Sequence, residues 1–147
     1  MTETTLPPNM QEFNEITTVI FAQLYIQFPM PKDLSADEVA KTLELSGPDV
    51  KPPSGRQFND VFVQVVIWLI NEGYIHSPTP VPLARVSLTS KALTVMNAVP
   101  TRLSAAPVTQ SLGTQIMTAA TDTSSASGKT FIGQVMGAFF GSISKSF

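Results

Sequence analysis

The longest apolar stretch of the chain covers residues 56–75 and reads RQFNDVFVQVVIWLINEGYI. Its apolar residues recur at spacings of three and four and cover most of the helical circumference. They leave a thin polar stripe at Asp60, Gln64 and Asn71. Residues 58–72 hold no turn residue and exceed the usual strand length. The pattern therefore predicts a helix that is buried nearly all round, with Trp68 in the core.

Local signals predict a hairpin and a further helix after this central helix. Gly73 suits the left-handed position that commonly follows a helix C terminus. Residues 74–76 and the alternating apolar residues of 84–88 predict two antiparallel strands, joined by the proline-rich SPTPVP. Thr89 is placed to cap a last helix over residues 90–98, before a proline.

Two helices are expected before the central one. Asn9 and Glu12 have the spacing of a capping box and predict the start of a first helix, which prolines end at residues 29 and 31. Its apolar face is formed by Phe13, Ile16, Ile20, Leu24 and Phe28. Ser35 and Glu38 form a second capping box and predict a short helix, which Gly-Pro at 47–48 closes. The Pro- and Gly-containing segment 46–57 predicts a loop.

The order of these elements, with the phrases LSADEVAKTL, WLINEGYI and SLTSKAL, resembles the winged helix-turn-helix superfamily over about residues 10–99. The resemblance implies an α+β winged-helix-like domain with three helices, a β-hairpin wing and a further helix. It also implies one of two activities, because members of the superfamily bind DNA through the third helix or use the same fold to hold protein partners.

Charge favours a protein partner over DNA. Residues 1–103 carry seven Lys or Arg and ten Asp or Glu, a net charge of −3. A negative net charge is unfavourable for binding nucleic acid. Asp60 would face phosphate on the helix that reads DNA. The loop before that helix is also longer than the superfamily's usual turn. The side chains that could contact nucleic acid are Arg56, Gln57, Asn59, Gln64 and Arg85.

Catalytic and metal sites are not expected. The chain has no cysteine, so disulfides, thiolate chemistry and cysteine-containing zinc sites are excluded. No nucleophile elbow or HExxH motif is present. Residues 123–130 nearly match the phosphate-binding G-x-x-x-x-G-K-[ST], but Thr123 replaces the first glycine and no strand pattern precedes it. The single histidine, His76, is expected on the wing surface. We therefore expect no enzyme, cofactor or small-molecule substrate.

From residue 100 onward the composition changes to Thr, Ser, Ala and Gly, which predicts a second module. We expect the winged-helix-like domain over residues 9–99, a linker over 100–111 and a helical tail over 112–147, with a flexible break at 121–128. The first tail helix is expected around Leu112, Ile116, Ala119 and Ala120.

The last apolar segment predicts an amphipathic helix with two faces. A candidate association face is formed by Ile132, Val135, Met136, Phe139, Phe140 and Ile143. A small-residue face is formed by Gly133, Gly137 and Gly141. Fifteen uncharged residues lie between Lys129 and Lys145, too few to span a bilayer core of about 30 Å. Association with another chain, with itself or with a membrane surface, and docking on its own domain, remain as alternatives.

These patterns predict a non-enzymatic interaction or adaptor module that associates through its C-terminal amphipathic helix. The alternative is a DNA-binding regulator that dimerises through its tail. The N terminus has neither a basic nor an apolar signal region, so the expected location is the cytoplasm, with a peripheral membrane location as a variant.

Overall fold

The computed structural model describes residues 7–44, 57–98, 110–123 and 125–145. In chain order the elements are α1 (Pro8–Gln27), α2 (Ala36–Thr42), α3 (Phe58–Asn71), β1 (Ile75–His76), β2 (Ser87–Leu88), α4 (Ser90–Met96), α5 (Leu112–Ala119) and α6 (Ala126–Lys145). The described residues are thus mostly helical, with one small two-stranded sheet, and at this level they confirm the expected α+β class.

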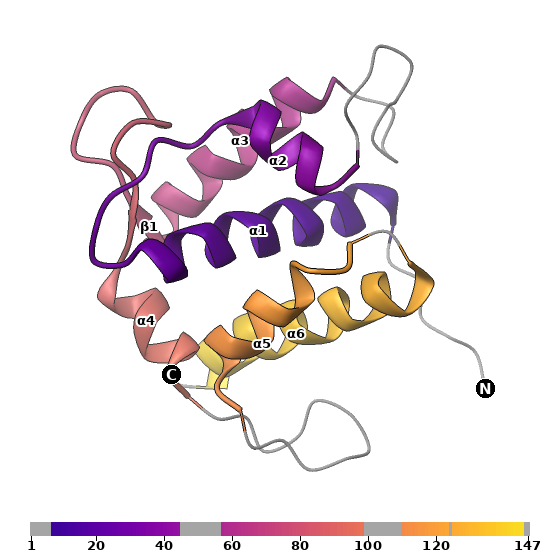
Figure 1. Ribbon diagram of the computed structural model, residues 1–147. Coiled ribbons are helices and arrows are strands. Elements are labelled where there is room, and N and C mark those ends of the chain that lie inside the picture. The colour runs from indigo at the N-terminus through magenta and orange to yellow at the C-terminus, as the bar shows by residue number, and fades with distance from the viewer. Residues whose placement is uncertain (1–6, 45–56, 99–109, 124, 146–147) are drawn as a thin grey trace.

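Helix α1 lies at the centre of the molecule (Figure 1). Helices α2 and α3 lie on one side of it and α5 and α6 on the other, while the hairpin and α4 close the end near its C terminus. This position explains why α1 buries polar as well as apolar residues. The apolar ones include Ile16, Ile20, Phe21 and Leu24, and the polar ones include Glu12, Asn14, Glu15, Thr17 and Thr18.

The start of α1 differs from the predicted capping box. The helix begins at Pro8, with Pro7 at the N-cap and no side-chain cap, so Asn9 lies inside the first turn. Proline suits the first helical position because its ring fixes φ and the N–H that it lacks would have no partner there. The predicted end is confirmed, since the helix stops at Gln27, just before Phe28 and Pro29.

The caps of the two short helices are confirmed. Ser35 Oγ accepts a hydrogen bond from the Glu38 N–H at 3.3 Å and starts α2. Thr89 Oγ1 accepts from the Ala92 N–H at 3.2 Å and starts α4, and it donates to the Gly73 carbonyl at 2.6 Å. Gly73 has φ +82°, as predicted for the residue that ends α3. The predicted closure of α2 at residues 47–48 is wrong, because the helix already ends at Thr42 with Leu43 as its C-cap.

Strands β1 and β2 form the predicted antiparallel hairpin. Ile75 pairs with Leu88 and His76 with Ser87. An isolated bridge between Lys32 and Val86 ties the segment after α1 to this hairpin, and the Leu34 N–H donates to the Leu83 carbonyl at 2.8 Å. Because the first and third quarters of the chain meet here, the hairpin is anchored against α1.

Helices α5 and α6, together called the C-terminal pair, share the hydrophobic core with α1. Leu112, Ile116 and Ala119 are buried as the predicted short helix requires. The division into a domain over residues 9–99 and a tail over 112–147 therefore crosses a continuous core in the structure. Most of the linker predicted at 100–111 lies outside the described residues.

Candidate functional site

Trp68 lies on the surface, with 41 % of the residue exposed. The prediction that it is largely buried is wrong, and its place on α3 explains why. Trp68 follows Gln64 by four residues and precedes Asn71 by three, so it belongs to the polar stripe. The buried residues of α3 are Phe62, Val65, Val66 and Leu69. The helix is therefore buried along one face, and its outer face carries a tryptophan.

Three aromatic side chains from three helices meet at this place, and we call Phe13, Trp68 and Phe140 the aromatic edge. The ring centroids of Phe13 and Trp68 are 5.2 Å apart, and Phe140 lies 6.0 Å from each. Tyr74 stacks behind Trp68 at 6.0 Å and is itself buried. These separations are those of directly packed rings, so the neighbours hold the partly exposed indole in place.

The structure places four members of the predicted association face in the core. Ile132, Val135, Met136 and Phe139 are buried, Phe140 is half-buried in the aromatic edge, and the side chain of Ile143 lies outside the described residues. Phe139 packs on Phe21 of α1 with ring centroids 4.9 Å apart. In this conformation Ile132, Val135, Met136 and Phe139 are covered by the chain's own helices and are not exposed for association.

The predicted small-residue face of α6 points to solvent. A Cβ added at Gly133, Gly137 or Gly141 would meet nothing within 4 Å. These glycines therefore have no packing role inside the described part of the chain. Elsewhere glycine is required by contact: a Cβ at Gly113 would lie 2.5 Å from the Tyr25 ring.

The candidate nucleic-acid contacts are not brought together. Asn59 and Gln64 are exposed on α3, beside Asp60, and Gln57 is exposed at the N-cap of that helix. Arg56 lies outside the described residues. Arg85 lies just before β2, which pairs with β1, the strand that follows α3. It has φ +52°, and its backbone N–H donates to Asp33 Oδ1 at 2.8 Å.

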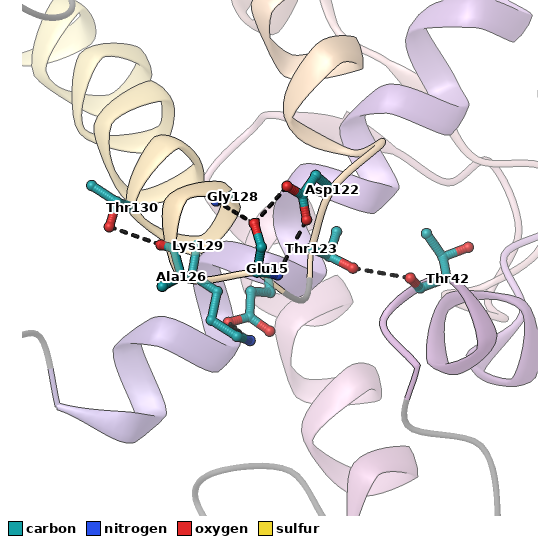
Figure 2. A network of polar contacts seen from close by, with 9 residues as sticks. Glu15, Thr42, Asp122, Thr123, Ala126, Gly128, Lys129 and Thr130 are labelled. Atoms are coloured by element: carbon teal, nitrogen blue, oxygen red, sulfur yellow. Dashed lines mark hydrogen bonds and ion pairs between the residues drawn. The ribbon is translucent and has the colours of Figure 1, made fainter.

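Of the segment that resembles a phosphate-binding loop, residues 126–130 form the start of α6 (Figure 2). Asp122 Oδ1 accepts from the Ser125 N–H at 3.1 Å, and Ser125 Oγ accepts from the Gly128 N–H at 3.0 Å. The Asp122 carboxylate lies so close that a Cβ at Gly128 would clash with it. A carboxylate thus occupies the end of the helix where a phosphate would bind. Of the predicted flexible break, residues 126–128 are helical.

An ion pair between the buried Glu15 and the exposed Lys129 joins α1 to the start of α6. Lys129 Nζ donates to Glu15 Oε2 at 3.1 Å, and only 5 % of Glu15 is exposed (Figure 2). Burial raises the pKa of the Glu15 carboxyl above its ordinary value, because it disfavours the charged form more than the Lys129 ammonium favours it. The sequence gives no sign of this pair, whose members are 114 residues apart.

We predict that the Glu15→Gln substitution stabilises the protein at neutral pH and that the gain shrinks in acid. The Glu15 carboxyl loses its proton at a lower pH in the unfolded chain than in the folded chain. Its contribution to stability therefore falls as pH rises from the unfolded pKa to the folded pKa. Urea unfolding of both proteins at pH 7 and at about pH 4 measures the difference between their free energies of unfolding. The exposed Glu72→Gln is the control. If the stability gain of Glu15→Gln grew at the lower pH, the pKa of Glu15 would not be raised in the folded protein.

Several large apolar residues outside the aromatic edge are also exposed. They are Met10, Ile26, Phe28, Met30 and Val81. His76 is exposed at the end of β1. Among the described residues no group of three or more His, Cys, Asp or Glu could hold a metal ion. No helix of that part of the chain is long and apolar enough to cross a membrane.

Comparisons with protein-family models, with curated proteins and with solved structures gave no match.

Proposed function

We propose that the chain is a non-catalytic, winged-helix-like interaction module that binds a protein partner through the aromatic edge. The observation that carries the proposal is the surface position of Trp68, held in place by Phe13, Tyr74 and Phe140. Tryptophan is enriched among the residues that dominate protein–protein binding energy. An indole that its neighbours already hold loses little side-chain freedom when a partner covers it.

The surroundings of Trp68 fit the anatomy of an interface. Apolar area from the half-buried Phe13 and Phe140 adjoins the indole, and the exposed Gln64 and Asn71 flank it along α3. A central aromatic group with a polar rim is the arrangement that protein-binding surfaces share. Helix α6 contributes Phe140, so the C-terminal amphipathic helix takes part in the proposed surface through its outer side.

The order of α1, α2, α3, the hairpin and α4 supports the winged-helix-like part of the proposal. In that arrangement the outer stripe of the third helix is the surface a ligand meets. Here the stripe carries Asp60, Gln64, Trp68 and Asn71. One acid, two amides and an indole are better suited to bind a protein surface than to bind a polyanion such as nucleic acid.

The test uses Trp68 as its own reporter, because it is the only tryptophan of the chain. A partner is first captured by cross-linking to the tagged full chain and then purified and titrated against it. We expect a blue shift of the tryptophan emission and protection from acrylamide quenching as the partner covers the indole. The same shift caused by raising the concentration of the chain alone would identify a second copy as the partner.

Two matched variants decide whether the aromatic edge is the surface used. Trp68→Glu should abolish capture, because it places a charge at the centre of the interface. Val81→Glu adds the same charge at an exposed apolar residue of the hairpin loop and should leave capture intact. Equal capture by the two variants, with both folded by circular dichroism, would refute the proposed site.

A further inference from the structure

One ridge of α3 is exposed along its whole length. Asp60, Gln64, Trp68 and Glu72 follow one another at intervals of four residues, so their side chains form one row along the helix. All four residues are exposed. The row begins in the first turn of α3, at Asp60, and ends at the C-cap, Glu72. An acid therefore lies at each end of the row that contains the indole.

The carboxylates of these two acids have no ion-pair partner. Neither Asp60 nor Glu72 takes part in a salt bridge within the described part of the chain. Lys91 reaches the C-terminal end of α3, where its Nζ donates to the Glu72 backbone carbonyl at 2.8 Å and lies 4.4 Å from the centroid of the Tyr74 ring. The ammonium thus satisfies the end of the helix and leaves the Glu72 side chain unpaired.

The helices that surround the indole add further negative charge. Helices α1 and α3, with the C-cap of α3, contain four carboxylates and no lysine or arginine. Helix α6 supplies two lysines, of which Lys129 pairs with Glu15, and the side chain of Lys145 lies outside the described residues. A surface of this charge favours a partner that carries positive charge.

The indole offers an apolar contact between the two acids. Trp68 follows Asp60 by eight residues and precedes Glu72 by four, which correspond to about 12 Å and about 6 Å along the helix axis. The ring of Phe13 adjoins the indole, and Met10, 41 % exposed, precedes Phe13 by three residues on the same face of α1. A side chain that rests on this surface is therefore apolar and has an acid on either side.

We propose that the segment of the partner that binds the aromatic edge is basic. It places an apolar side chain on Trp68, one lysine or arginine at Asp60 and another at Glu72. In an extended segment, at about 3.3 Å per residue, the two cations stand about four residues from the apolar residue on one side and two on the other. In a helical segment these separations are about eight and four residues. This assignment rests on the proposed function and adds the chemistry of the partner to it.

Two synthetic peptides without tryptophan are the probes, and the full chain is titrated with each. Both have a central leucine. The extended peptide carries lysine two and four residues away on both sides, and the helical peptide carries it four and eight residues away, so that either direction of binding is allowed. We expect at least one of them to shift the Trp68 emission to the blue below about 1 mM peptide, and to bind more weakly at high salt. The same peptides with glutamate in place of lysine should not bind.

Exchange of the charges tests the pairing itself. In the double variant Asp60→Lys/Glu72→Lys the preference should reverse, so that the glutamate peptide binds at least about fivefold more tightly than the lysine peptide. The control is Asp37→Lys/Glu44→Lys, which changes the net charge equally at exposed carboxylates on and just after α2. This control should keep the preference for lysine. Circular dichroism checks that both variants are folded.

Failure of both lysine peptides to shift the emission below that concentration would overturn the assignment, and so would equal peptide preferences in the two double variants. The proposed function would still stand if a captured partner covered Trp68 equally well in the wild type and in Asp60→Lys/Glu72→Lys, because the partner would then bind the edge without basic residues. If neither the peptides nor a captured partner covered Trp68, both the assignment and the proposed function would fail.

Discussion

The Phe139→Asp variant is expected to melt more than about 10 °C below the wild type, with a loss of about 4–5 kcal/mol in the free energy of unfolding. Phe139 is 0 % exposed, and its ring lies 4.9 Å from that of Phe21 and 5.6 Å from that of Tyr74. The substitution removes these contacts and brings an unpaired charge to an apolar site. Thermal melts followed by circular dichroism measure the effect.

Gly137→Asp is the matched control, because it places the same charge on the same helix. A Cβ at Gly137 meets nothing within 4 Å, so the new side chain points to solvent. Its effect should stay within about 1 kcal/mol, and leaving glycine slightly favours the helix. If Phe139→Asp melted within a few degrees of Gly137→Asp, α6 would not be docked in the core as described.

Phe21→Ala is expected to cost about 3–5 kcal/mol, the usual loss for a buried phenylalanine. Phe21 is fully buried on α1 and contacts both Tyr74, next to β1, and Phe139 of α6. Its removal leaves a cavity where the two sides of the molecule meet. Urea unfolding, with the slope compared between variants, gives the loss.

Trp68→Ala should cost clearly less than Phe21→Ala, about 1–2 kcal/mol, because part of the indole is already in water. The order of the two losses tests the placement of α3. A tryptophan substitution that destabilised the protein more than the phenylalanine one would mean that Trp68 is buried and that α3 is rotated about its axis.

Elements set by a few neighbouring residues could be predicted from the sequence. Ser35 and Thr89 cap their helices through hydrogen bonds three residues ahead, and Gly73 ends α3 with a positive φ. These signals are local, so their geometry does not depend on the rest of the fold. Asn9 shows the limit of the rule, because Pro8 next to it starts the helix first.

The surface position of Trp68 could have been predicted from its position in the helical repeat relative to Gln64 and Asn71. Its spacing from Gln64 and Asn71 places it on the polar stripe, yet its size and its apolar neighbours in sequence outweighed that spacing in our prediction. Residue type favours burial of a tryptophan on average, whereas phase decides which face a given residue occupies. The aromatic edge was missed for this reason.

The burial of Glu15 and the docking of α6 could not be predicted in the same way. An apolar arc shows that α6 must be covered but not by what, since any matching apolar surface would serve. In the structure the surface that covers α6 includes Phe21 of α1. The carboxylate of Glu15 meets Lys129 only because α6 docks on α1. Contacts between residues more than a hundred positions apart follow from the assembled fold and leave no local pattern.

Proton–proton Overhauser contacts between aromatic rings directly test the packing of α6 on α1 within one core. We expect cross-peaks from the Phe139 ring to the rings of Phe21 and Tyr74, whose centroids lie 4.9 and 5.6 Å away. A Phe139 ring at random-coil shifts, without contacts to either ring in the monomeric protein, would show that α6 does not pack on α1.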